Sequence, residues 1–269
     1  MSEDDEEDVT IYRHYCPPGV KRVLASGSSA FIGEVDNSTV LKYPLSPNGD
    51  MSRLEVEKQL LEAVGHHDRI IKLKGSSAVG LYLERAVMGN IYQYLVESTN
   101  PSPPTTRQQL SWCREATEAV VHVHSRNIIH CDIQPTNLLL DDDLHIKLSD
   151  FQGKLLSLDK KVLLDGGSSE PTRFSRPRDD LDNADLHTDL FALGCTIYFI
   201  IMGNAVYPDI KDGDEGWHEE VRARFAKQQF PDDMTVCADL AWKCWLGKYD
   251  SAKGLLSDIM RVEDAYAEL

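Results

Sequence analysis

Three oxygen-bearing side chains in the middle of the chain have a spacing that could do chemistry. Asp132 is followed five residues later by Asn137 and eighteen residues later by Asp150. Between the last two lie short apolar segments, residues 138–140 and 146–148, joined by a turn that contains three aspartates. This pattern predicts a β-hairpin flanked by two acidic sites.

The chemistry that suits this spacing is phosphoryl transfer from ATP. The γ-phosphoryl group carries spread negative charge that metal ions must neutralise. Mg²⁺ prefers oxygen ligands and takes few protein carboxylates, so Asn137 and Asp150 are candidate metal ligands. A separate carboxylate, Asp132, would orient the acceptor hydroxyl and accept its proton. A solvated acidic turn is the simpler explanation for any single aspartate, but the joint pattern favours the catalytic interpretation.

The motifs around these residues resemble those of a known family. The segment H-C-D-I-Q-P-T-N at residues 130–137, followed by D-F-Q-G at 150–153, resembles the H-R-D-x-x-x-x-N and D-F-G motifs of eukaryotic protein kinases. The resemblance covers roughly residues 21–259. It implies an α+β, two-lobed fold in which a small five-stranded β lobe with one helix lies over a large, mainly α-helical lobe. We expect an ATP-binding N-lobe and hinge at residues 11–86 and a catalytic, substrate-binding C-lobe at 87–269.

The resemblance assigns an ion pair to the N-lobe. Lys42, in T-V-L-K-Y-P, matches the strand lysine that contacts the α- and β-phosphates. On its own, a lysine in a strand would be an ordinary surface charge. Glu57, in the helix that follows, matches the glutamate that pairs with this lysine. Glu55 is the competing candidate, but Glu57 precedes Leu60 and Leu61 by three and four residues, which places it beside the buried stripe of the helix.

The glycine-rich loop over the phosphates is the weakest match. The family pattern G-x-G-x-x-G falls on residues 25–30, where alanines replace the outer glycines and only Gly27 remains. Glycines at these positions let backbone N–H groups approach the phosphates without interference from a Cβ atom. The resemblance implies that Ala25 and Gly27 contact the nucleotide, although the segment by itself would pass for an ordinary hairpin turn.

The segment Leu83-Glu84-Arg85-Ala86 matches the hinge between the two lobes. The resemblance implies that backbone groups of Glu84 and Ala86 hydrogen-bond the adenine edge and that Leu83 lies at the back of the pocket. A plain linker is the alternative, and the position of the segment between a predicted strand and a predicted helix favours the hinge.

Two further matches concern the C-lobe. Residues 188–194 resemble the D-x-W-x-x-G opening of a large-lobe helix, where Asp189 would cap the helix and hold the catalytic-loop backbone. Arg178 falls where kinases carry the acidic residue of A-P-E. A charge-reversed pair of Arg178 with Asp250 is one candidate replacement for the usual ion pair of that motif.

Three departures from the family pattern leave the activity open. Cys131 stands where regulated kinases have Arg, so a phosphorylated activation loop lacks its usual cationic partner. Gln134 stands where Ser/Thr kinases carry a Lys that stabilises the transferring phosphoryl group. Gln152 replaces the Gly of D-F-G, and Gly153 follows it. The favoured function is MgATP-dependent phosphorylation of protein Ser or Thr. A nucleotide-binding or scaffolding pseudokinase and a kinase-like small-molecule phosphotransferase are the alternatives.

The composition and net charge limit the classes of partner that the chain is expected to bind. The 269 residues carry a net charge of −16, which argues against nucleic acid or anionic membrane as the main partner and leaves ATP and a protein substrate. The acidic run at residues 3–8 predicts a disordered tail over residues 1–10. Six cysteines without a C-x-x-C pair, and the absence of a signal peptide pattern, predict free thiols inside the cell, in the cytoplasm or nucleus. The longest apolar run, residues 190–202, is too short for membrane insertion and predicts a buried helix.

Hydrophobic periodicity predicts the remaining elements. The expected strands and helices alternate in the order of a kinase small lobe followed by a helical lobe. They are strands within residues 22–41, a helix at 51–64, strands at 70–73 and 80–83, helices at 90–98 and 108–125, and mainly helices from 186 onward.

Overall fold

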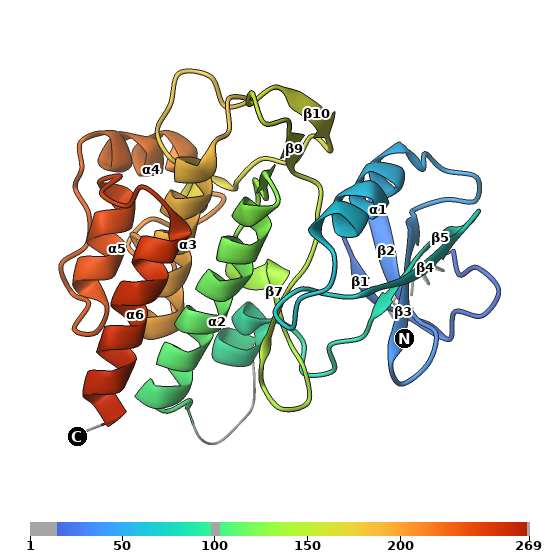
Figure 1. The fold of residues 1–269 in the computed structure, drawn as a ribbon, viewed down its shortest axis with the longest axis horizontal. Coiled ribbons are helices and arrows are strands. Elements are labelled where there is room, and N and C mark those ends of the chain that lie inside the picture. The colour runs from blue at the N-terminus through green and yellow to red at the C-terminus, as the bar shows by residue number, and fades with distance from the viewer. Residues whose placement is uncertain (1–14, 98–102, 268–269) are drawn as a thin grey trace, which may run out of the picture.

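The computed structural model describes residues 15–97 and 103–267. It has a sheet-rich lobe and a helical lobe, seen at the right and left of Figure 1, so the expected α+β, two-lobed kinase fold is confirmed. The predicted acidic tail lies outside the described residues.

The small lobe contains an antiparallel sheet in the order β1-β2-β3-β5-β4, as far as the described residues show. Its strands are β1 (Arg22–Ser26), β2 (Ala30–Glu34), β3 (Thr39–Pro44), β4 (Leu73–Ser77) and β5 (Gly80–Glu84). Helix α1 (Ser52–Val64) connects β3 to β4 and lies over the sheet, as Figure 1 shows.

The central strand β3 is buried on both faces. Leu41 and Tyr43 pack with Phe31 in a small apolar cluster, while Val40 belongs to the main core. Because side chains alternate along a strand, Lys42 points to the same face as Val40. The strand therefore carries a buried cation on the side of the sheet that faces the main core.

One predicted strand is placed differently. The sequence indicates a strand at residues 70–73, but β4 begins only at Leu73. Ile70 instead forms a parallel bridge with Leu148, and the N–H of Ile71 donates to the Leu148 carbonyl at 2.9 Å. These β-branched residues pair with a strand of the large lobe rather than with the small-lobe sheet, and the prediction of a strand at 70–73 is wrong for this reason.

The large lobe is built from helices. The longer ones are α2 (Thr106–Ser125), α3 (Leu186–Met202), α4 (Trp217–Ala226), α5 (Ala238–Trp245) and α6 (Ala252–Ala267). The helix predicted at residues 90–98 has a π-helical stretch at Gln93–Glu97, and the predicted helix at 108–125 corresponds to α2.

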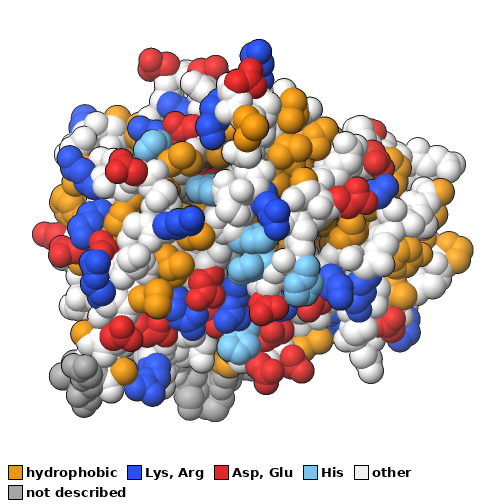
Figure 2. All heavy atoms as spheres, in the orientation of Figure 1, with side chains coloured by type: hydrophobic (Ala, Val, Ile, Leu, Met, Phe, Trp, Pro, Cys, Tyr) orange, Lys and Arg blue, Asp and Glu red, His pale blue; other side chains and the backbone are white. Residues whose placement is uncertain are grey.

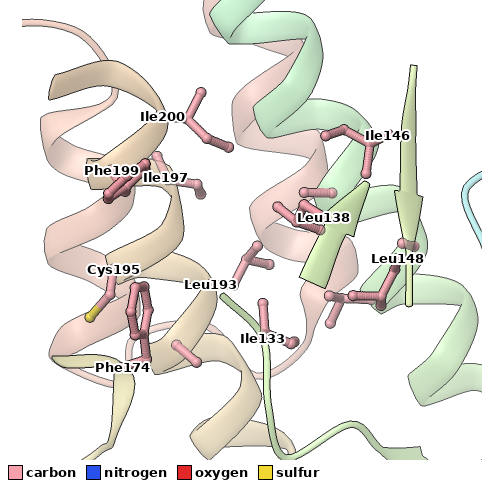
Figure 3. Packing of buried hydrophobic residues seen from close by; sticks show 14 of the residues in the cluster. Ile133, Leu138, Ile146, Leu148, Phe174, Leu193, Cys195, Ile197, Phe199 and Ile200 are labelled. Carbon is pink, nitrogen blue, oxygen red and sulfur yellow. The ribbon is translucent and has the colours of Figure 1, made fainter. Parts of the chain in front are cut away.

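Helix α3 forms the centre of this lobe. All of its residues from Thr188 to Ile200 are buried, as expected for a helix that is apolar on every side. In Figure 3, Leu193 of α3 points toward Leu138, and Ile133 lies beside them. The segment at residues 133–138 is thus packed directly on the most buried helix. Within the described ranges, no helix is both long and apolar enough to cross a bilayer.

Short strands cover the side of the large lobe that meets the small lobe. They are β6 (Ile128–Ile129), β7 (Leu138–Leu140), β8 (Ile146–Leu148), β9 (Lys154–Leu156) and β10 (Val162–Asp165). Strands β7 and β8 form the predicted hairpin, and β9 pairs with both β10 and β6. The β9–β10 hairpin exposes the apolar side chains of Leu158, Val162 and Leu163 to solvent, and hydrophobic atoms appear in that part of Figure 2.

Candidate active site

The β7–β8 hairpin positions two of the expected metal ligands. Asn137 directly precedes β7 and Asp150 comes two residues after the end of β8. Because Leu138 pairs with Leu148, the two ends of the hairpin lie side by side. The N–H and hydroxyl of Ser149 both donate to the Asn137 carbonyl, at 2.9 and 3.0 Å, which closes the open end of the hairpin.

Asp132 is held by two side-chain amides. Asn137 Nδ2 donates to Asp132 Oδ2 at 2.8 Å and to its carbonyl at 2.9 Å, while Gln134 Nε2 donates to Oδ1 at 2.6 Å. Burial, followed by the negative charge of Asp150, raises the pKa of Asp132 to about 7, although both amide hydrogen bonds act in the opposite direction. Asp132 is therefore a fixed carboxyl group that can exchange a proton near neutral pH.

A buried aspartate of α3 holds the loop that carries Asp132. Asp189 Oδ2 accepts from the His130 N–H at 2.8 Å, and its Oδ1 accepts from the Cys131 N–H at 2.9 Å. His124 Nε2 lies 2.9 Å from the same carboxylate. The main chain of the loop is thus bound to the core helix through one side chain.

The expectation that Asp189 also caps α3 is wrong. The helix begins at Leu186, and Asp185 is its N-cap, whose carboxylate accepts from the N–H groups of His187 and Thr188. The hydroxyl of Thr188 completes a capping box. Asp189 lies inside the first turn, and its side chain is free to bind the catalytic loop because another residue satisfies the helix end.

His130 links the loop to the segment that contains Asp150. Its Nδ1 accepts from the Asp132 N–H at 3.3 Å, so Nε2 carries the proton and donates to the Ser149 carbonyl at 3.0 Å. Burial lowers the pKa of His130, which favours this neutral tautomer. The ring also meets Phe151 edge to face, with 4.9 Å between the ring centres.

Lys42 connects the two lobes. Its Nζ lies 2.5 Å from Glu57 Oε2 and 2.5 Å from Asp150 Oδ1. Glu57 is fully buried on α1, whereas Glu55 is exposed and lies near Lys58 instead. The structure therefore brings Glu57, and not Glu55, to the lysine. We call Lys42, Glu57 and Asp150 the Lys42 centre.

Charge and burial oppose each other in the Lys42 centre. Burial alone would lower the pKa of Lys42, but the carboxylates of Glu57 and Asp150 outweigh it and raise that pKa above its usual value. Burial would raise the pKa of Asp150, but Lys42 outweighs it and holds that pKa below its usual range. Asp132 and Asp150 thus have pKa values moved in opposite directions, as in sites where two carboxyl groups have separate roles.

The loop expected over the nucleotide is a tight hairpin turn between β1 and β2. Ala25 pairs with Ile32 after a bulge that begins at Val23, and the Gly27 N–H donates to the Ala30 carbonyl at 2.8 Å. A Cβ atom on Gly27 would lie 3.5 Å from that carbonyl oxygen, an ordinary contact. The turn itself therefore does not require glycine at position 27.

The expected hinge begins within β5, whose last two residues are Leu83 and Glu84. Leu83 is buried and pairs with Val40 of β3. The Glu84 N–H donates to the Lys72 carbonyl at 2.8 Å, which ties the end of β5 to the chain just before β4. Ala86 is partly buried and packs against the main core.

Arg178 pairs with a different residue from the candidate. Its guanidinium donates to Glu170 Oε2 at 2.7 Å and to the Leu181 carbonyl at 2.7 Å, whereas Asp250 is exposed. The suggested pair with Asp250 is therefore wrong, because an acid only eight residues upstream lies nearer to Arg178. We call Arg178 and Glu170 the Arg178 centre.

Two contacts and one electrostatic effect were not foreseen from the sequence. His124 binds Asp189, the charge of Glu170 contributes to the raised pKa of Asp132, and the Gln152 amide donates to Glu57 at 3.3 Å. Each joins segments far apart in the chain. Of these three, only the contact of Gln152 had a signal in the sequence. A polar side chain in place of the Gly of D-F-G, at a position expected to be buried, needs a hydrogen-bond partner.

The two lobes, the Lys42 centre and the loop with Asp132 and Asn137 together define a phosphotransferase of the two-lobed kinase class. Residues 40–265 match the family model described as the protein kinase domain, and the chain belongs to the protein kinase family.

Several curated kinases are similar to this chain. It is 27% identical over 188 residues to Serine/threonine-protein kinase PLK4 of Drosophila virilis, covering 68% of this chain and 23% of that protein. It is 28% identical over 173 residues to 3-phosphoinositide-dependent protein kinase 1 of Arabidopsis thaliana, covering 59% and 34%. It is 38% identical over 136 residues to the liver/testis phosphorylase b kinase gamma catalytic chain of Mus musculus, covering 49% and 32%. The chain therefore matches between 23% and 34% of the length of these relatives.

Proposed function

We propose that this chain is an active protein kinase that transfers the γ-phosphoryl group of MgATP to Ser or Thr hydroxyls of a protein substrate. The observation that carries the proposal is the Lys42 centre, in which Lys42 Nζ meets both Glu57 and Asp150 at 2.5 Å. Asp150 lies 108 positions from Lys42, so folding assembles this centre from both lobes. The similarity to Ser/Thr kinases supports the choice of acceptor.

Lobe roles follow from this proposal. Residues 11–86 would bind the nucleotide and form the hinge, and residues 87–269 would carry the catalytic loop and the protein-binding surface. Acidic and basic side chains are interspersed over the face seen in Figure 2, and this face has no continuous basic patch of the kind that binds nucleic acid. The free thiols of the described chain suit an intracellular location, cytoplasmic or nuclear.

The donor atoms fit Mg²⁺. Asn137 uses its amide nitrogen on Asp132, which leaves Oδ1 for a metal ion. Asp150 uses Oδ1 on Lys42, which leaves Oδ2, and its side chain is 38% exposed. Hard oxygen donors in small number suit Mg²⁺, which keeps much of its water shell. When bound, the metal would neutralise charge on the phosphates.

Residues of the small lobe would bind the nucleotide. Lys42 would contact the α- and β-phosphates, with its rotamer fixed by Glu57. The backbone at Ala25 and Gly27 would approach the phosphates, which gives Gly27 a reason that the turn itself does not supply. The Glu84 carbonyl and the Ala86 amide would meet the adenine edge beside Leu83.

Asp132 would serve the acceptor. Its carboxylate would accept a hydrogen bond from the Ser or Thr hydroxyl and take the proton as the oxygen attacks the γ-phosphorus. The bond between the γ-phosphorus and the bridging oxygen breaks, and ADP leaves. A pKa of about 7 gives Asp132 enough basicity to accept this proton while a large fraction remains ionised at neutral pH.

A non-catalytic nucleotide-binding module is the second candidate. It is favoured by Gln134, whose amide occupies Asp132 Oδ1 at 2.6 Å where the family places a cation. Residues 133–136 contain no Lys or Arg, so the neutral amide adds no charge to stabilise the transferring phosphoryl group.

The test separates binding from turnover. Pure protein is melted with and without MgATP, then incubated with labelled ATP, Mg²⁺ and a generic basic protein. Saturation at about 100 times the dissociation constant should add about 2.7 kcal/mol to the free energy of unfolding. Label should appear on Ser or Thr of the acceptor. Asp132→Asn should abolish the transfer, whereas Asp142→Asn, on the exposed hairpin turn, should not.

Each outcome identifies one candidate. Stabilisation with transfer supports the kinase. Stabilisation without transfer, across several protein acceptors, supports the nucleotide-binding module. A melt unchanged by MgATP contradicts both.

A further inference from the structure

The Gln152 side chain lies where the D-F-G motif has no side chain at all. It is buried, with 7% of its surface exposed. Its Nε2 donates to Glu57 Oε2 at 3.3 Å, the same oxygen that accepts from Lys42 Nζ. The start of the activation segment, residues 150–178, is therefore in direct contact with the buried face of α1.

The Gln152 main chain is fixed on both sides. Its N–H donates to the Asp150 carbonyl at 3.0 Å, and its carbonyl accepts from the Ser168 N–H at 3.1 Å. Gly166 passes so close that a Cβ atom there would lie 2.3 Å from the Gln152 carbonyl oxygen. The side chain thus projects from a main chain that is hydrogen-bonded to both Asp150 and Ser168.

The shift of glycine from position 152 to 153 has a physical reason. A Cβ atom on Gly153 would lie 2.1 Å from the Ile129 carbonyl oxygen, so position 153 cannot carry a side chain beside β6. Gln152 is not among the residues of the described chain with positive φ, so a side chain at this position is unstrained. The sequence Gln-Gly therefore puts the close approach at 153 and frees 152 for a side chain that reaches α1.

Glu57 depends on this contact. In the described part of the chain its Oε1 has no hydrogen-bond partner, so Lys42 and Gln152 supply the side-chain hydrogen bonds to this buried carboxyl group through Oε2. A buried carboxylate with few partners is costly to hold in place. Without Gln152, the Lys42 ammonium would be the remaining donor.

We propose that Gln152 is a positioning residue, whose amide fixes Glu57 and through it Lys42, and so couples α1 to the activation segment. This inference rests on the proposed kinase function. It assigns to Gln152 an effect on turnover that a side chain which merely fills space would not have.

The test uses substitutions of Gln152 that separate the effect of its amide hydrogen bond from the effect of its side-chain volume. Gln152→Met keeps the length of the side chain and removes the donor, and Gln152→Glu places an acceptor against Glu57. Gln229→Met changes an exposed Gln in the same way and is the matched control. We expect kcat to fall about tenfold in Gln152→Met, the usual size of a lost hydrogen bond to a charged group, and further in Gln152→Glu. The KM for ATP should change less than kcat.

A double-mutant comparison identifies Glu57 as the intermediary. In a Glu57→Gln background, Gln152→Met should change kcat by less than twofold, because the group that it positions has been replaced. A space-filling role predicts the same effect in both backgrounds, so equal effects would overturn the inference.

Hydrogen exchange without nucleotide separates this inference from the proposed function. Amides of Ser52–Val64 should exchange faster in Gln152→Met than in wild type or Gln229→Met. If wild type binds no MgATP and transfers no phosphate, the proposed function fails, and with it the role in turnover. If wild type is active while Gln152→Met matches it in kcat and in α1 exchange, the inference fails and the function stands.

Discussion

Two buried ion-pair centres in this molecule differ in reach and in exposure. The Lys42 centre joins residues 15 and 108 positions apart, from both lobes, and the Asp150 side chain is 38% exposed. The Arg178 centre joins residues eight positions apart, and both of its side chains are nearly sealed from solvent. Each has a buried glutamate oxygen without a hydrogen-bond partner among the described residues.

Under the proposed function, the difference separates a reactive site from a structural one. The charges of the Lys42 centre can be shared with a ligand, because one member is open to solvent. The Arg178 centre has no such opening, and its further bond to the Leu181 carbonyl keeps all these contacts within residues 170–181. Buried ion pairs alone are weak evidence for function, and access to solvent decides between the two interpretations.

The largest expected effect tests the structural member of this comparison. Arg178→Met should lower the free energy of unfolding by about 3–5 kcal/mol, because it leaves the Glu170 carboxylate buried and unpaired. Urea unfolding measures the change. Adding Glu170→Gln should recover most of it. Equal stability of Arg178→Met and wild type would show that the sealed pair contributes little.

The next effect concerns the reactive member. Lys42→Met should reduce turnover about 10²–10³-fold, the usual cost of one electrostatic contact in a transition state. The protein should still fold, because burial raises the pKa of Glu57 and lets its carboxyl take a proton. Steady-state rates with Lys161→Met, an exposed lysine, are the control. A turnover rate of Lys42→Met within fivefold of the wild-type rate would contradict the role proposed for Lys42.

A pH effect on stability follows from Asp132. Its folded pKa of about 7 exceeds the unfolded value of about 3.9, so the folded state binds more protons between these values. The contribution of Asp132 to the stability of the metal-free protein should therefore fall as the pH rises from 4 to 7, by at most about 1.4 kcal/mol per unit. Melts of Asp132→Asn beside wild type measure this, and the variant should gain relative to wild type as the pH rises. If the stabilities of wild type and Asp132→Asn changed with pH in parallel, folding would not raise the pKa of Asp132.

The smallest effect concerns the neutral amide beside Asp132. Gln134→Lys should raise turnover several-fold, because an ammonium group would stabilise charge on the transferring phosphoryl group. Initial rates at saturating MgATP measure this, with Gln134→Met as the neutral comparison. A slower Gln134→Lys would indicate that the site relies on the hydrogen bond to Asp132 rather than on charge.

Much of the fold could be predicted because local signals agreed with it. Helix α2 has Thr105 as its N-cap, and its predicted span differs from the observed one by two residues at the start. The β7–β8 hairpin follows from two apolar triplets around an acidic turn. The pairing of Ile70 with Leu148 and that of β9 with β6 could not be predicted, because in both cases the partner lies elsewhere in the chain.

The candidate site also contains residues that the sequence could place and contacts that it could not. Asp132, Asn137 and Asp150 could be placed from spacing because a single loop and hairpin carries them. The partner of Arg178 could not, since the sequence does not say which of many acids lies nearest. A kinase template also contains no side chain at the Gln152 position, so it predicts no contact with Glu57.

The β9–β10 hairpin has a consequence for encounters with a substrate. The chain after Asp150 pairs with itself and with β6 in the folded protein. Segments that become ordered only on binding lose conformational entropy at that moment, by roughly 1–2 kcal/mol for each residue fixed. Here that loss occurs during folding. Association with a protein substrate should therefore approach rigid-body docking, with a rate set by diffusion and orientation rather than by the folding of a loop.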